Sequence, residues 1–232
     1  MRSENDAFTL LELLLVIAVV SLLISLIVGG YGNVTHIRNQ SESAARLRQW
    51  GVALRAYVAD HDGDLPRRGQ GVQPVVILNR PEDWFNALPP YVGQESYWQR
   101  NNNFHRPLEN ERSLFVRPGA RDPGGIAFLS YGMNMNLSPW NLPSPTRLAQ
   151  IERPSITVFL AESPGSYAST YPSKRPYGCI APHNGKGNIL FLDGHVAAFE
   201  AAYLGVGDGD PKRDDVRWLT GTISDAQAEN YR

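Results

Sequence analysis

The first quarter of the chain predicts one long helix with two different surfaces. Residues 8–28 are apolar except for Glu12 and three hydroxyl side chains, and a helix needs roughly 20 such residues to cross a lipid bilayer. From residue 29 to residue 60, apolar residues recur every three or four positions, which predicts that the helix continues with one apolar face. Gly63 and Pro66 follow, and both oppose further helix.

The second half of the chain predicts β-strands. Residues 126–131 form one candidate strand, and residues 156–161 form a continuous apolar, β-branched run that is typical of a buried strand. Two further apolar runs, residues 188–192 and 195–199, flank Asp193-Gly194, a residue pair that favours a tight hairpin turn. The order of these elements predicts an α+β fold in which a long N-terminal helix, with a membrane half and an amphipathic half, packs on an antiparallel β-sheet.

Composition narrows the classes of function. The chain has 232 residues and a net charge of −1, so it lacks the basic excess that indicates nucleic-acid binding. Cys179 is the single cysteine, which excludes an internal disulfide and a zinc site made of paired cysteines. Within one large domain, stability therefore depends on the hydrophobic core or on a bound ion.

Glu12 is the one charged residue in the apolar run. A carboxylate at that depth in a membrane costs on the order of 3 kcal/mol, and we find no counter-charge elsewhere in the run. If the chain is cut between Ala7 and Phe8, the new amino group of Phe8 lies one helical turn from Glu12. The amino group can then neutralise the carboxylate, either within one subunit or between staggered subunits, where the pair sets their register.

This stretch resembles a known processing signal. Ala7-Phe8-Thr9-Leu10-Leu11-Glu12, followed by an apolar helix, is similar to the prepilin signal of type IV pilins and type II secretion pseudopilins. The resemblance implies that a prepilin peptidase cuts after Ala7, that Phe8 is methylated, and that Glu12 guides subunit docking. One departure is Ala7 itself, because the family usually has glycine at that position.

The resemblance also implies a domain organisation and a location. Residues 1–7 would be the leader, 8–28 a transmembrane helix, 29–60 its amphipathic continuation and 61–232 a periplasmic α+β head domain. The protein would lie in the inner membrane with its N-terminus in the cytoplasm. The charge bias opposes this topology, because Arg38, Arg46 and Arg48 follow the apolar run while only Arg2 precedes it. We give the cleavage motif more weight, because long domains cross membranes largely regardless of their charge.

Motifs in the rest of the chain extend the resemblance to the planctomycete–verrucomicrobial branch of pilin-like proteins. This branch carries a DGHV hairpin near its C-terminus, which corresponds to residues 193–196. The other motifs that carry the similarity are residues 57–63, 88–91, 130–134 and 183–185.

His183, Asp193 and His195 are candidate metal ligands. Two imidazoles and one carboxylate suit a metal ion that keeps open coordination positions. The same residues also fit a structural polar cluster, because Asp193 is explained as the first residue of a tight turn. Their role stays open at this point.

A second candidate ion site is the acidic stretch of residues 207–215. Carboxylates on a glycine-rich loop suit the flexible oxygen coordination of calcium. Lys212 and Arg213 supply counter-charges within the stretch and favour a solvated loop instead. The candidate ligands are Asp208, Asp210, Asp214 and Asp215.

These observations predict a structural protein that is not an enzyme and needs no cofactor. It would be a subunit of a type IV pilus or a type II secretion pseudopilus, assembled through its N-terminal helix. Its partners would be the prepilin peptidase, other pilin or pseudopilin subunits, the inner-membrane assembly platform and membrane lipid, and no nucleic acid is indicated. The alternative hypothesis is a membrane-tethered extracytoplasmic domain that binds metal or catalyses a reaction through His183, Asp193 and His195.

Overall fold

The computed structural model describes residues 9–103 and 105–219, without the side chains of residues 26–33. The predicted leader, residues 1–7, and Phe8 lie outside the described residues. The chain divides into two compact units, Met1–Arg38 and Asn39–Arg232, and each is described by itself.

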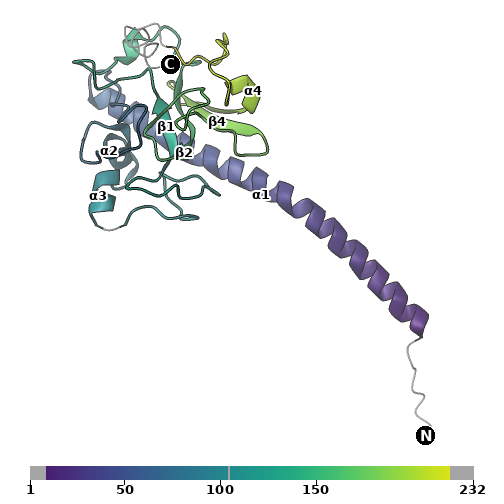
Figure 1. The fold of residues 1–232 in the computed structure, drawn as a ribbon. Coiled ribbons are helices and arrows are strands. Elements are labelled where there is room, and N and C mark those ends of the chain that lie inside the picture. Colours follow the sequence, from purple (N-terminus) through teal and green to yellow (C-terminus); the bar gives the residue numbers. More distant parts are fainter. Residues whose placement is uncertain (1–8, 104, 220–232) are drawn as a thin grey trace. The chain divides into compact units, whose positions relative to one another are not determined.

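Helix α1 runs from Leu10 to Asp60 and contributes to both units (Figure 1). Its end agrees with the sequence prediction, because the chain leaves the helix at residues 61–63. There Gly63 has a φ of 87°, in the left-handed region that glycine enters without a steric penalty.

The predicted membrane half of this helix is wrong for the described residues. None of the helices that they form combines the length and the apolar character needed to cross a membrane.

The second unit is built on a five-stranded sheet with the strand order β3-β1-β2-β4-β5. Neighbouring strands are antiparallel except for β3, which pairs with β1 in parallel. The strands are β1 (Leu129–Asn134), β2 (Val158–Gly165), β3 (Ser169–Thr170), β4 (Lys186–Phe191) and β5 (Val196–Glu200).

The sheet is therefore mixed, and the predicted wholly antiparallel sheet is wrong. Strand β2 runs against β1, and the chain reverses direction again between Gly165 and Ser169. The next strand must then run parallel to β1, and it pairs with the free edge of β1 by placing Ser169 opposite Met133. A strand of two residues has no hydrophobic pattern from which the sequence could have predicted this pairing.

The hairpin of β4 and β5 confirms the sequence prediction. Asp193-Gly194 forms the turn, and Gly194 has a φ of 91°. The register pairs Lys186 with Glu200 at the open end and Leu190 with Val196 at the turn end.

Short helices cover the remaining segments of the second unit. Helix α2 ends just before Pro89-Pro90, and these prolines begin η1, a 3₁₀ turn. The short helices are α2 (Trp84–Ala87), η1 (Pro89–Val92), α3 (Tyr97–Asn102), η2 (Leu148–Gln150) and α4 (Ala201–Leu204).

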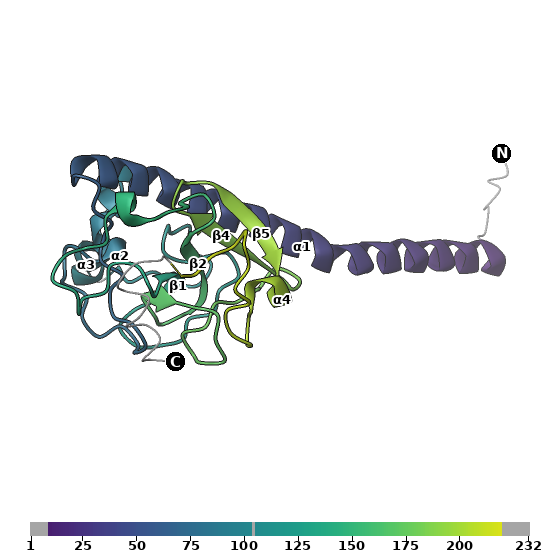
Figure 2. The ribbon, with the colours of Figure 1, turned by 90° about the horizontal axis from the view of Figure 1, so that it is seen from above.

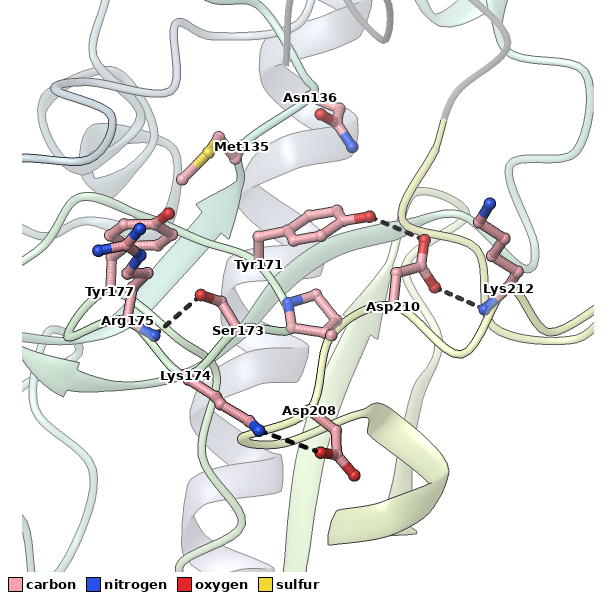
Figure 3. A pocket seen from close by; sticks show the side chains of 12 residues that line it. Met135, Asn136, Tyr171, Ser173, Lys174, Arg175, Tyr177, Asp208, Asp210 and Lys212 are labelled. Atoms are coloured by element: carbon pink, nitrogen blue, oxygen red, sulfur yellow. Dashed lines mark hydrogen bonds and ion pairs between the residues drawn. The ribbon is translucent and has the colours of Figure 1, made fainter. Parts of the chain in front are cut away.

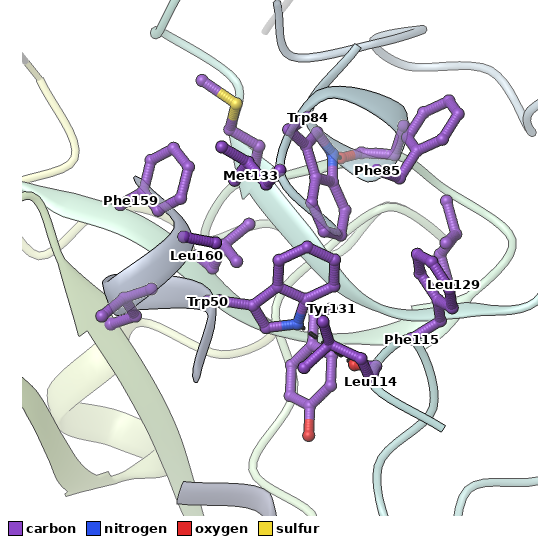
Figure 4. Close-up of a cluster of buried hydrophobic side chains, with 14 of the residues drawn as sticks. Trp50, Trp84, Phe85, Leu114, Phe115, Leu129, Tyr131, Met133, Phe159 and Leu160 are labelled. Carbon is purple, nitrogen blue, oxygen red and sulfur yellow. Dashed lines mark hydrogen bonds between the residues drawn. The ribbon is translucent and has the colours of Figure 1, made fainter. Parts of the chain in front are cut away.

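The second half of α1 lies along one face of the sheet (Figure 2). Leu47, Trp50 and Leu54 are fully buried, in one cluster with Leu160 of β2 and Leu190 of β4. The ring of Trp50 packs edge-on against Trp84 of α2, with centroids 5.0 Å apart (Figure 4). Aromatic pairs of this geometry stabilise a core beyond the area that they bury.

A second apolar cluster covers the opposite face of the sheet. Val158, Ala161, Ile189 and Phe191 contribute to it, while Leu190 belongs to the first cluster. In β4 this alternation follows from the two-residue period of a strand. In β2, Val158 and Ala161 reach the same face because the register is irregular between Val158 and Leu160. Trp218, near the end of the described residues, is fully buried in the second cluster.

Candidate functional site

Residues 10–24 of α1 present an exposed apolar surface. The exposed fraction of their large apolar side chains ranges from 47% at Val20 to 79% at Leu10. Contiguous apolar surface on a protein marks a site that contacts another protein or a lipid. This segment is therefore the candidate interaction site of the first unit.

Glu12 lies in the first turn of this helix and has a local partner. Its Oε2 accepts hydrogen bonds from the backbone N–H of Thr9 at 2.9 Å and from the Thr9 hydroxyl at 2.8 Å. The Glu12 N–H donates back to Thr9 Oγ1 at 3.3 Å. These reciprocal bonds form a capping box, which satisfies backbone N–H groups that a helix start leaves unpaired.

The capping box gives Glu12 a hydrogen-bonding partner that the sequence analysis did not identify. Thr9 supplies two donors, although it supplies no positive charge. The sequence signal was present, because Thr-x-x-Glu at the start of a helix is the capping-box pattern. Ala7 and Phe8, the predicted cleavage site, lie outside the described residues, so the pairing of Phe8 with Glu12 stays a prediction.

His183 lies in a buried polar network inside the head domain. Its Nε2 lies 2.6 Å from Oε1 of Glu162, and both side chains are almost completely buried. Ser43 of α1 donates to the same oxygen at 2.5 Å and contacts the hydroxyl of Tyr131 at 3.0 Å. The backbone N–H of Asn188 donates to Glu162 Oε2 at 2.9 Å. The network joins α1 to β1, β2 and β4 through one carboxylate.

Sequence reasoning did not identify Glu162 or Ser43 as members of this network. The sequence did contain a signal at Glu162. This residue directly follows the apolar run 156–161, so a strand that continues past that run places a carboxylate in a buried position. Buried carboxylates in proteins are paired or hydrogen-bonded. Ser43 carries no such signal, because its partners are 88 and 119 residues away in the sequence.

Asp193 and His195 lie apart from His183, at the turn of the β4–β5 hairpin. His195 Nδ1 lies 2.6 Å from Asp193 Oδ1, and both side chains are exposed. His183 instead pairs with Lys186 at the opposite end of β4. Because a strand advances about 3.4 Å per residue, the hairpin keeps the two histidines apart. The structure therefore does not bring the three predicted residues together.

The predicted calcium ligands are engaged with protein groups. Asp210 accepts a hydrogen bond from the Tyr171 hydroxyl at 2.9 Å, and Asp208 lies 3.9 Å from Lys174 Nζ. Hydrogen bonds from Tyr203 and Arg213 hold the pKa of Asp215 below its usual range.

Asp214 is exposed and belongs to the same loop. Across residues 9–103 and 105–219, no group of three or more histidine, cysteine or carboxylate side chains is placed to hold a metal ion. The predicted metal ligands thus form no metal centre within that part of the chain.

Comparisons with family models, with curated proteins and with solved structures found no match to this chain.

Proposed function

We propose that this protein is a structural subunit of a filament of the type IV pilus or type II secretion pseudopilus kind. It does no covalent chemistry itself. The observation that carries the proposal is the exposed apolar surface of residues 10–24, which begins directly after the pilin-like Ala7-Phe8 sequence. Such a surface needs a partner, and copies of the same helix would supply one.

In this proposal the prepilin peptidase cuts after Ala7, at the inner membrane. Lipid contacts the apolar segment before assembly, and neighbouring subunits on the assembly platform contact it afterwards. Head-to-tail contacts that do not close a ring generate an open helical filament.

Glu12 has two separable roles in this proposal. Within the subunit its carboxylate caps α1 through Thr9. In the filament it pairs with the Phe8 amino group of a neighbour, and the two charges set the axial register. The Thr9 hydroxyl matters only for the first role, because it carries no charge.

The experiment compares Glu12→Ala with Thr9→Ala, expressed in place of the native chain. Both changes weaken the cap, and losing a helix cap costs about 1 kcal/mol. Only Glu12→Ala removes the charge that guides docking. We expect Glu12→Ala to be processed normally but to reduce the subunit in the sheared-filament fraction at least tenfold, while Thr9→Ala stays within about twofold of the native level.

Mass spectrometry of the native N-terminus completes the test. The proposal requires a mature chain that begins at methylated Phe8. A mature chain that retains Met1, or normal incorporation of Glu12→Ala into filaments, would overturn it.

A further inference from the structure

The head domain contains a pocket with a cavity volume of about 320 Å³ (Figure 3). Three segments that are distant in the sequence form its walls. They are the turn directly after β1 with Met135 and Asn136, the segment from Tyr171 to Tyr177, and the loop from Asp208 to Lys212. The proposed filament function does not use this pocket.

The rim of the pocket carries unpaired positive charge. Lys174 and Arg175 are exposed on one wall, and Lys212 is exposed on the loop that also carries Asp208 and Asp210 (Figure 3). Lys174 has a loose ion pair with Asp208 at 3.9 Å. The charged groups of Arg175 and Lys212 have no counter-ion among the residues that the structure describes. A negatively charged ligand would supply one.

The floor of the pocket is apolar and aromatic. Met135, Tyr171 and Tyr177 are each at least nine-tenths buried, and Tyr171 packs edge-on against Trp218 with centroids 5.8 Å apart. The Tyr171 hydroxyl donates to Asp210, which fixes the ring in the wall (Figure 3). A rigid aromatic surface beside charged groups suits a ligand with both an apolar face and polar edges.

A buried acceptor without a donor lies in the same wall. Asn136 is fully buried, and its Nδ2 donates to the carbonyl of Trp218 at 2.7 Å. Its Oδ1 receives no hydrogen bond within the described part of the chain. A buried acceptor that lacks a donor costs free energy, and a ligand that supplies a donor removes that cost.

These features together select the class of ligand. It must carry negative charge for Arg175 and Lys212, donors for Asn136 and Asp208, and an apolar face for Tyr171. A phosphodiester has the charge but no donor for the unpaired acceptor of Asn136. A sugar acid has a carboxylate, several hydroxyl donors and a face of C–H groups.

We infer that this pocket binds an acidic sugar, such as a uronic acid unit of a polysaccharide. A carboxylate of one sugar unit pairs with Arg175, and a carboxylate of the next unit pairs with Lys212 on the other side of the pocket (Figure 3). The hydroxyl groups of the sugar donate to the acceptors between these two cations. Only one or two units fit a cavity of this size, so contacts with a longer chain continue along the surface.

The test is isothermal titration of the full chain, kept in a mild detergent, with trigalacturonate. Maltotriose serves as the neutral trisaccharide, and an oligothymidylate of the same charge serves as the nucleic-acid probe. We expect trigalacturonate to bind at low salt, to bind at least tenfold more weakly at high salt, and to bind more tightly than either other probe.

Two variants and one control locate the site. Arg175→Glu and Lys212→Glu should each weaken trigalacturonate binding at least tenfold, and both residues are exposed, so the fold should tolerate the changes. Arg48→Glu changes the net charge equally on the exposed face of α1 and should leave binding unaltered. The inference is overturned if trigalacturonate does not bind, if the control weakens binding as much as the pocket variants, or if maltotriose or oligothymidylate binds as tightly.

Discussion

At the scale of single residues, Glu162 concentrates more interactions than any residue that the sequence pattern singled out. Three donors from three different segments meet on one fully buried carboxylate. Buried charges cost several kcal/mol unless they are paired and hydrogen-bonded. The network therefore makes the head domain sensitive to the loss of this one group.

We predict that Glu162→Gln lowers the free energy of unfolding by about 3 kcal/mol, because it leaves His183 and Ser43 with a weaker acceptor. Urea denaturation of the full chain in detergent measures the change. Glu200→Gln is the matched control, since Glu200 is 63% exposed and pairs with Lys186 at the surface. That control should change the stability by less than about 0.5 kcal/mol. Equal losses in both variants would contradict the importance of the buried network.

Asp83 is a second buried carboxylate, and it gives the fold a pH dependence. Burial raises the pKa of Asp83 to about 6, although the hydrogen bond from Trp140 Nε1 and the charge of Arg80 lower it. A carboxyl group whose pKa is higher in the folded state binds its proton more tightly there. Its contribution to stability is therefore complete below about pH 4 and is lost as the pH rises through about 6.

We predict that Asp83→Asn removes this dependence. The amide stays neutral and can still accept from Trp140, so the variant should gain on the order of 3 kcal/mol relative to the native chain between pH 4 and pH 7. Unfolding free energies measured across that range provide the test. Glu95→Gln changes an exposed carboxylate that is not among the charges acting on Asp83, and it should leave the pH profile unchanged. Parallel profiles for Asp83→Asn and the native chain would contradict the prediction.

At the scale of elements, the fit of α1 against the sheet depends on Gly51. A Cβ atom at this position would lie 3.0 Å from both the carbonyl oxygen of Gly194 and Cδ1 of Leu190. Glycine lowers helix propensity by about 1 kcal/mol relative to alanine. The close approach to the β4–β5 hairpin explains why a glycine serves here inside a helix.

We predict that Gly51→Val destabilises the head domain by about 1–3 kcal/mol, because the new side chain forces α1 away from the hairpin. Thermal denaturation measures the effect. Ala45→Val places the same side chain on the exposed face of α1, where it meets no such neighbour. The control should cost less than about 0.5 kcal/mol, and similar losses at both positions would argue against close packing as the cause.

At the scale of the whole molecule, the two units differ in how many buried apolar residues they contain. Both apolar clusters of the head domain draw their buried residues from Leu47 onward. Among the residues that the structure describes, the first unit, Met1–Arg38, contributes none to either cluster. The head domain therefore contains its own core, whereas the large apolar side chains of residues 10–24 are exposed.

We predict that a fragment beginning at Asn39 folds independently. Its thermal midpoint should lie within about 3 °C of that of the full chain in detergent, because the deleted residues add no buried core. It should be monomeric by size-exclusion chromatography with light scattering, while the full chain without detergent associates. A fragment that fails to fold, or a full chain that stays monomeric without detergent, would contradict this division.

Local sequence patterns determined where the long helix runs and where the chain turns. The helix end near Gly63 and the turn at Asp193-Gly194 follow from the conformations that glycine allows, and both are as predicted. The apolar run after Phe8 and the amphipathic stretch that follows it identified one continuous helix. These features depend on residues within a few positions of each other, so the sequence carries them directly.

Only the tertiary structure decided which distant residues meet. His183 pairs with Glu162 rather than with Asp193 or His195, because the length of β4 separates the ends of the hairpin. The parallel pairing of β3, and the pocket that joins Asn136, Tyr171 and Asp210, likewise depend on how separate segments pack. Sequence periodicity tells which face of an element is buried. Which element covers that face is settled only when the complete core forms.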